Sequence, residues 1–94
     1  MADQRRISRL LRACPLFLKE LRKLDRQAQK AILAYLDQRI AGKEDPRRFG
    51  KGLRANLAGL WRYRVGDYRI LCQIQDGLLL VLVISVGHRK NVNE

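Results

Sequence analysis

Apolar residues in the first half of the chain recur at intervals of three and four, which is the spacing of one face of a helix. The segment Pro15–Leu24 predicts a short helix, because proline suits the first helical turn and apolar positions follow at helical spacing. A second helix is predicted from its cap at Asp25 to about Ala41, with Gly42 in the usual place of a C-terminal cap. We expect the two helices to run antiparallel. The apolar face of the second helix would consist of Ala28, Ile32, Tyr35, Leu36 and Ile40.

The hydrophobic period changes after residues 42–56, which hold three glycines, one proline and five lysines or arginines and predict a basic loop. Three later segments rich in β-branched and aromatic residues predict strands at Leu60–Val65, Tyr68–Gln75 and Leu78–Val86. The pairs Gly66-Asp67 and Asp76-Gly77 predict two-residue turns of types II′ and I′ between them. We therefore expect a three-stranded antiparallel meander.

A two-residue turn at Gly66-Asp67 fixes the pairing of the first hairpin, so that Arg64 faces Arg69. One side of the sheet would then be apolar and covered by the helices, and the other would carry Arg62, Arg64 and Arg69, here called the arginine face. Like charges opposite one another destabilise a sheet by about 0.2–1 kcal/mol, whereas a bound phosphate would reverse the sign. Since the planar fork of arginine suits phosphate, we interpret the arginine face as an anion-binding surface rather than a solvated charged one. The apolar side would consist of Trp61, Tyr63, Val65, Tyr68, Ile70, Cys72, Ile74, Leu79, Val81 and Val83.

Lysine and arginine outnumber aspartate and glutamate by 20 to 9, which gives a formal net charge of +11. This excess predicts a polyanionic partner, which could be nucleic acid, an acidic protein or an anionic membrane surface. A chain of 94 residues has room for one domain, so we expect residues 1–94 to form a single domain.

The longest apolar run, Leu78–Val86, is about half the length of a membrane-spanning helix, and the first residues, MADQRRIS, lack the apolar segment of a signal peptide. We therefore expect a cytoplasmic protein. The chain has two cysteines, Cys14 and Cys72, and one histidine. These numbers predict no disulfide framework, no metal site and no cofactor, and both cysteines are interpreted as small core residues.

The segment GLWRYRVGDYRILCQIQD, followed by VLVISVGHRKNV, resembles the RelE/ParE toxins of type II toxin–antitoxin systems. The upstream segments FLKELRKLD and DPRRFGKGLRANLAGLWRYR resemble the same family, so the likeness covers about Pro15 to Val92. The resemblance implies an α+β fold, with an N-terminal edge strand and two antiparallel helices packed on a twisted antiparallel sheet. It places a strand in the first dozen residues, although the apolar residues there would also suit a helix.

The ribonuclease branch of this family, the mRNA interferases, cuts messenger RNA on the ribosome without a metal. By resemblance, the phosphate-gripping and transition-state residues are Arg62, Arg64, Arg69 and Arg89. Lys51 and Lys90 would add contacts to RNA. The family has a catalytic tyrosine where this chain has Asn93, which cannot exchange a proton, so the resemblance implies weakened catalysis.

Cleavage by the ribose 2′-hydroxyl requires one group to remove a proton and another to supply one, and arginine does neither well. His88 is the best candidate for proton transfer, because its ordinary pKa is near neutrality. Strand alternation places it on the arginine face, although a packing role at the strand end is equally compatible with the sequence. Lys51, Lys90 and Tyr68 are weaker candidates.

Two other functions fit parts of the sequence. The ParE branch has the same fold and inhibits DNA gyrase without catalysis, which would suit the missing acid–base chemistry. The basic N-terminal segment could instead form a surface helix of a plain nucleic-acid or membrane-binding module. We favour the ribonuclease branch because its mechanism uses phosphate-facing arginines, and we expect no membrane partner.

The resemblance also implies an acidic antitoxin that binds the toxin in a hetero-oligomer, in addition to the ribosome and its messenger RNA. The charge of +11 makes such a partner reasonable, because complementary fields speed association.

Overall fold

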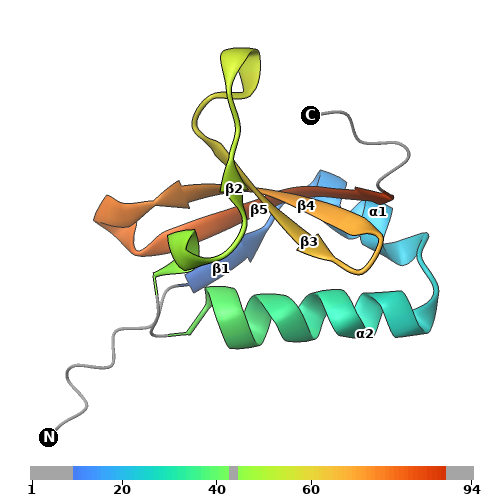
Figure 1. Cartoon of the computed structure of the whole chain (residues 1–94). Coiled ribbons are helices and arrows are strands. Elements are labelled where there is room, and N and C mark those ends of the chain that lie inside the picture. The colour runs from blue at the N-terminus through green and yellow to red at the C-terminus, as the bar shows by residue number, and fades with distance from the viewer. Residues whose placement is uncertain (1–9, 43–44, 89–94) are drawn as a thin grey trace, which may run out of the picture.

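A five-stranded sheet forms the centre of the computed structural model, which describes residues 10–42 and 45–88 (Figure 1). The strands lie in the order β1-β5-β4-β3-β2, and each neighbouring pair is antiparallel except β1 and β5, which are parallel. The sheet is therefore mixed, and the expected N-terminal strand is confirmed at its edge. The strands are β1 (Leu10–Ala13), β2 (Lys51–Gly52), β3 (Leu60–Val65), β4 (Tyr68–Gln75) and β5 (Leu80–His88).

Two helices form where the capping signals predict them. Helix α1 (Pro15–Arg22) has its proline in the first turn, and helix α2 (Arg26–Tyr35) is capped by Asp25, whose carboxylate accepts a 2.8 Å hydrogen bond from the Ala28 amide. A π-helical turn, Leu36–Ile40, prolongs α2. The cap predicted at Gly42 is wrong, because the Ala41 amide closes the π turn on the Leu36 carbonyl at 2.9 Å, and Gly42 does not have the positive φ of a left-handed cap.

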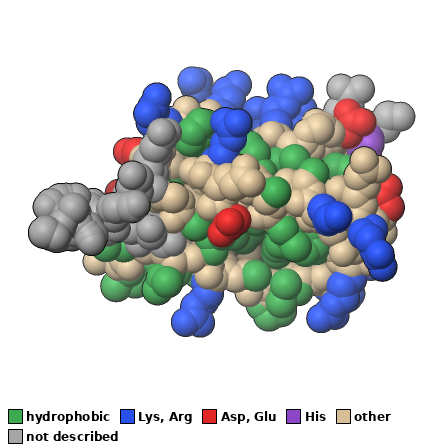
Figure 2. Space-filling model, turned by 90° about the horizontal axis from the view of Figure 1, so that it is seen from below, with side chains coloured by type: hydrophobic (Ala, Val, Ile, Leu, Met, Phe, Trp, Pro, Cys, Tyr) green, Lys and Arg blue, Asp and Glu red, His purple; other side chains and the backbone are tan. Residues whose placement is uncertain are grey.

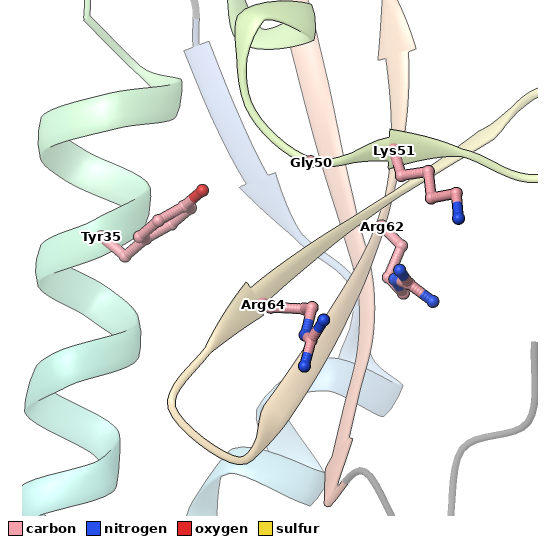
Figure 3. Close-up of a pocket in the computed structure, with 5 residues that line it drawn as sticks. All are labelled: Tyr35, Gly50, Lys51, Arg62 and Arg64. Carbon is pink, nitrogen blue, oxygen red and sulfur yellow. The ribbon is translucent and has the colours of Figure 1, made fainter.

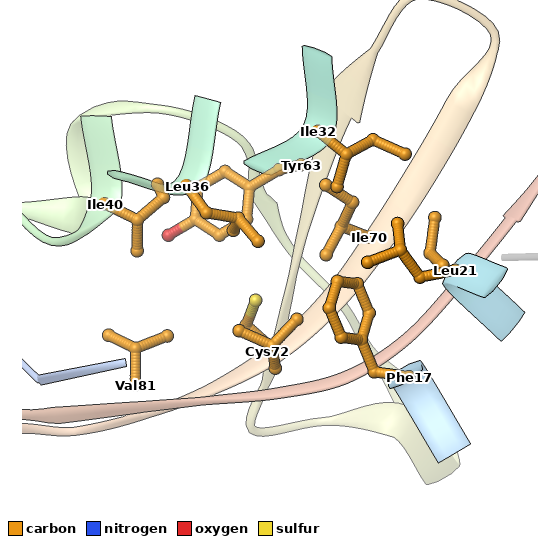
Figure 4. Close-up of a cluster of buried hydrophobic side chains, with 11 residues drawn as sticks. Phe17, Leu21, Ile32, Leu36, Ile40, Tyr63, Ile70, Cys72 and Val81 are labelled. Atoms are coloured by element: carbon orange, nitrogen blue, oxygen red, sulfur yellow. The ribbon is translucent and has the colours of Figure 1, made fainter. Parts of the chain in front are cut away.

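Both helices pack on one face of the sheet and enclose the core (Figures 1 and 4). Tyr63 lies fully buried in this core, and its hydroxyl donates a 2.8 Å hydrogen bond to the Pro46 carbonyl, which ties the segment after α2 to β3. The predicted apolar face of the sheet is thereby confirmed in its central part. The core residues are Phe17, Leu21, Ile32, Leu36, Ile40, Tyr63, Ile70, Cys72, Val81, Val83 and Val86.

The predicted loop at residues 42–56 contains structure that its composition does not signal. Lys51 and Gly52 form β2 against β3, and short 3-10 helices occupy Pro46–Arg48 and Ala55–Leu57. Figure 1 shows the segment between β2 and β3 rising from the sheet on the side opposite α2. Pairing with a distant strand creates β2, and local sequence signals do not contain that information.

One of the two predicted hairpin turns is confirmed. Gly66 has a φ of 60° and Val65 pairs directly with Tyr68, so a two-residue turn joins β3 and β4. The second turn is longer than predicted, because Gln75 pairs with Leu80 and four residues lie between them. These form a 3-10 helix, Asp76–Leu78, followed by Leu79 with a φ of 49°.

A β-bulge interrupts the pairing of β4 with β5. Leu71 pairs with Ser85 and Cys72 with Val83, so Ile84 is an extra residue in β5. The bulge reverses the alternation of side chains beyond it. Val86 consequently turns into the core, where simple alternation from Val83 would place it on the arginine face.

Candidate nucleic-acid interface

The arginine face forms as the turn at Gly66 predicts. Arg64 and Arg69 are direct partners across β3 and β4, and Arg62 is opposite Leu71 on the same side of the sheet. Since neighbouring side chains in a strand point to opposite faces, the burial of Tyr63 and Ile70 leaves the three arginines on the side away from the helices. The register on which this prediction depended is confirmed.

Arg62 is unusually buried for an arginine on an open sheet face. Its side chain is only 7% exposed, and Lys51 is its direct partner on β2. Burial, and then the positive charges of Arg69 and Arg64, lower the pKa of Arg62 below its ordinary value. The cluster thus concentrates positive charge where solvation is reduced, and an anion placed there would offset both effects.

A hollow of about 350 Å³ lies beside the arginine face at the edge of β3, lined by Tyr35, Gly50, Lys51, Arg62 and Arg64. Figure 3 shows the side chains of Lys51, Arg62 and Arg64 extending to the side of the strand away from α2, whereas Tyr35 reaches toward the strand from α2. Three positive side chains around one hollow can bind a phosphate group.

Gly50 allows the backbone to close this hollow. Its φ of 74° lies in the left-handed region, and a Cβ atom there would overlap the carbonyl oxygen of Arg62 and approach the ring of Tyr63 to 2.7 Å. Only glycine permits the chain to come so near to β3, and this contact delivers Lys51 to its place beside Arg62.

Tyr35 was predicted only as part of the apolar helix face, and in the structure it also lines this hollow. Burial is the main cause that raises the pKa of its phenol, with Arg39 acting in the opposite direction, so the hydroxyl keeps its proton. The guanidinium carbon of Arg39 lies 5.8 Å from the centre of the Tyr35 ring. Helical spacing alone could not show that β2 ends after two residues and leaves this part of the β3 edge open to the tyrosine.

The predicted position of His88 on the arginine face is wrong. Because of the bulge in β5, His88 is opposite Tyr68 and lies on the other side of the sheet, with the two rings 5.5 Å apart and nearly perpendicular at 83°. Among the described residues, the arginine face therefore supplies positive charge but no group that exchanges a proton near neutral pH.

Three predicted site residues, Arg89, Lys90 and Asn93, lie outside the described residues. The described part of the chain contains no cluster of histidine, cysteine and acidic side chains that could hold a metal ion, and no helix there is long and apolar enough to cross a membrane. Cys72 is buried, as predicted, and Cys14 is partly buried at the start of α1.

Comparison with known proteins agrees with these features. A family model described as the ParE toxin of the type II toxin–antitoxin system parDE matches residues 11–93. Toxin RelG of Mycobacterium tuberculosis is 42% identical over 48 residues, which are 51% of this chain and 55% of that protein. The chain spans about half the length of the curated relatives that it matches.

Two solved structures are similar over most of their length. The toxin–antitoxin complex RelBE2 of Mycobacterium tuberculosis contains a chain with a TM-score of 0.81 and 29% identity, covering 90% of this chain and 95% of that one. The isolated RelE toxin of E. coli has a TM-score of 0.70 and 28% identity, covering 86% of this chain and 84% of that one. Since the family model covers most of the sequence and the fold agrees, the chain belongs to the ParE toxin family of type II toxin–antitoxin systems.

Proposed function

We propose that this toxin is a ribosome-dependent messenger RNA endonuclease that works without a metal. The observation that carries the proposal is the arginine face, where a nearly buried Arg62 lies between Lys51 and two further arginines. Gyrase inhibition gives such a cluster no specific use, whereas cleavage of a phosphodiester does. Similarity to toxins named RelG and RelE supports the same branch.

The proposed reaction begins with attack of a ribose 2′-oxygen on the adjacent phosphorus. The bond from phosphorus to the 5′-oxygen breaks, which leaves a 2′,3′-cyclic phosphate and a 5′-hydroxyl. Arg62, Arg64, Arg69 and Arg89 stabilise the added negative charge, and Lys51 and Lys90 hold the flanking backbone. A proton leaves the 2′-hydroxyl and another reaches the 5′-oxygen, and these transfers are the weak point of this chain.

By the family resemblance Asn93 stands in place of a tyrosine, and His88 lies on the opposite face, so we propose that RNA binding is retained while cleavage is attenuated. Ribosomes programmed with a defined messenger, incubated with the parent and with Asn93→Tyr, test this by primer extension. Stronger cleavage by the variant supports the proposal. Absence of cleavage by both proteins contradicts it.

Inhibition of DNA gyrase is the second candidate, and one observation favours it. The described part of the arginine face holds no proton-transfer group, since the β5 bulge turns His88 away. A non-enzymatic toxin would need none. A supercoiling assay with the same preparations separates the two functions, because only a gyrase inhibitor blocks supercoiling.

We also propose an acidic antitoxin as the partner that holds the toxin inactive, as the toxin–antitoxin complex of Mycobacterium tuberculosis suggests. The helix side of the molecule suits such a partner. Figure 2 shows apolar side chains in the middle of this side, with many of the basic ones nearer its rim. The helices leave Leu16, Leu18 and Leu33 each 40–49% exposed, and an amphipathic helix of the partner could cover apolar side chains of this kind.

A further inference from the structure

A second hollow lies next to the arginine face and is built by one continuous segment. It has a volume of about 770 Å³ and is lined by every residue from Lys51 to Leu57. This volume is within the range of about 300–1,000 Å³ that is usual for sites of small organic groups. Lys51 lines both hollows, so the second adjoins the phosphate-sized one at this lysine.

The segment is held in a defined shape. Its base is closed by a 3.0 Å hydrogen bond from the Leu53 amide to the Leu60 carbonyl, and its tip by two further 3.0 Å backbone bonds within residues 54–58. Ala55 has a φ of 57°, a left-handed conformation that costs an L-residue about 1 kcal/mol or more. Strain of this kind is typical of functional sites that the surrounding structure fixes in place.

The base of the segment packs against the side chain of Trp61. A Cβ atom on Gly52 would meet the Trp61 ring at 3.0 Å, so the glycine backbone packs against the indole. The indole nitrogen donates a 2.6 Å hydrogen bond to the Phe49 carbonyl, which fixes the ring from the other end of β2. The hollow therefore has a fixed position relative to Lys51 and Arg62.

Its lining combines the chemical groups that recognise an unpaired base. Leu53 and Leu57 are partly buried and offer apolar contact, whereas Arg54 and Asn56 are exposed. A guanidinium plane stacks on bases in single-stranded RNA, and an asparagine amide can donate to and accept from the edge of adenine. The adjoining cations would hold the phosphate of the same strand.

We propose that the segment Lys51–Leu57 binds one unpaired nucleobase, with a preference for adenine, of an RNA strand whose backbone lies on the arginine face. This inference rests on the proposed action on RNA and adds a base-recognition site to it. Arg54 stacks on the base and Asn56 pairs with its edge. The site would give the toxin a sequence preference that phosphate contacts cannot provide.

The test uses two short 2′-O-methyl oligonucleotides of equal length, which lack the attacking hydroxyl and therefore cannot be cut. One has abasic sites throughout, and the other keeps a single central adenine. Fluorescence anisotropy at fixed low salt measures the binding of each to the full chain. We expect the adenine to strengthen binding about tenfold, as one well-placed base contact does.

The double variant Arg54→Ala, Asn56→Ala should bind both oligonucleotides equally. A matched control, Arg26→Ala with Gln27→Ala, also removes one arginine and one side-chain amide, from exposed positions at the start of α2, and should keep the tenfold difference. Thermal melting by circular dichroism checks that each variant is folded. A third comparison tests the edge contact separately, with the single variant Asn56→Ala and an oligonucleotide whose one base is uracil instead of adenine. The parent should prefer adenine over uracil, and this preference should disappear in the variant.

Equal binding of both oligonucleotides by the parent would overturn the inference. A tenfold difference that persists in the Arg54 and Asn56 double variant would overturn it as well. Neither measurement involves ribosomes or cleavage. A base-dependent affinity without ribosomal cleavage would therefore contradict the proposed enzymatic function and leave the base site standing.

Discussion

Arg64 and Arg69 lie directly opposite one another on β3 and β4, where two positive side chains repel. An isolated sheet gains nothing from such a pair, because favourable cross-strand pairs contribute about 0.2–1 kcal/mol and like charges cost a similar amount. Arg62, nearly buried beside them, adds to this repulsion. The arrangement is explained if a polyanion occupies the surface during function.

Substitution of Arg64 by glutamine should therefore stabilise the fold and weaken RNA binding at the same time. Removal of one charge from the repelling pair is expected to raise the free energy of unfolding by about 0.2–1 kcal/mol at low salt. The gain should shrink at high salt, where the charges are screened. Urea unfolding at two ionic strengths measures it, and a less stable Arg64→Gln protein would contradict the repulsion.

Two buried acidic protons should make the protein sensitive to alkali. Burial raises the pKa of the Cys72 thiol to about 12 from an ordinary value of 9.0, and it also raises the pKa of the Tyr63 phenol. At a pH between the ordinary pKa of each group and its raised pKa, the group has lost its proton in the unfolded chain but keeps it in the folded protein. Stability should thus fall as pH rises above about 9, by up to 1.4 kcal/mol per pH unit for each group.

A Cys72→Ala variant separates the contribution of the thiol from that of the phenol. Its free energy of unfolding should fall less steeply than that of the parent between about pH 9 and 10, where the thiol of the unfolded chain titrates ahead of the phenol. Urea unfolding across this range gives the two slopes, and the comparison of slopes is independent of any cavity that the substitution leaves. Identical slopes would show that Cys72 is not protected in the folded state.

At the scale of elements, the bulge in β5 decides which side chains meet the arginine face. Glu20 of α1 reaches this region, because its carboxylate accepts a 2.9 Å hydrogen bond from the amide of Val86, just beyond the bulge. The helix thereby fixes which side chains at the end of β5 point to each face of the sheet. Both the burial of Val86 and the position of His88 depend on this alternation.

Substitution of Glu20 should destabilise the fold by an amount that depends on whether an acceptor for the Val86 amide remains. Glu20→Ala leaves a partly buried amide without its partner and is expected to lower the free energy of unfolding by about 1–3 kcal/mol. Glu20→Gln keeps a carbonyl oxygen at the same place and should lose clearly less. Urea unfolding compares the two, and equal losses would mean that the bond does not stabilise the bulge.

Some elements of this fold have local causes in the sequence, and others depend on contacts between distant segments. Pro15, Asp25 and the pair Gly66-Asp67 act on their immediate neighbours, so both helices and the β3–β4 hairpin were predictable, and the arginine face followed from them. The bulge was not predictable, because the run VLVISV contains no local signal for it. The direction of the side chains beyond it is set by the contact with α1. Strand β2 and the two hollows depend in the same way on contacts between distant segments.

The described part of the molecule is a flat body of 45 × 33 × 22 Å with two different sides. The helices occupy one side, and the arginine face with the raised segment before β3 occupies the other (Figure 1). A partner protein and a nucleic acid could therefore be bound on separate surfaces. The charge of +11 would attract both acidic proteins and RNA.

The salt dependence of RNA binding should report how many phosphates the protein contacts. The logarithm of the affinity for a single strand falls by about 0.7 per phosphate for each tenfold rise in salt. Phosphate contacts from the six cations of the proposed site predict a slope of roughly −4. These cations are Arg62, Arg64, Arg69, Arg89, Lys51 and Lys90. Arg64→Gln should make the slope shallower by about 0.7, and a flat salt response of the parent would rule out binding through the arginine face.

The central claim, that the arginine face is where RNA is cut, is tested most directly by cleavage on programmed ribosomes. Three forms of the Asn93→Tyr protein would be compared: unaltered, with Arg62, Arg64 and Arg69 changed to glutamine, and with Arg22, Arg26 and Lys30 changed to glutamine. Both triple variants remove three positive charges, and the second set comes from exposed positions on the helices. We expect the helix variant to cut the messenger like the unaltered form and the arginine-face variant to lose cleavage. Cleavage that survives in the arginine-face variant, or is lost equally in both, would contradict the account.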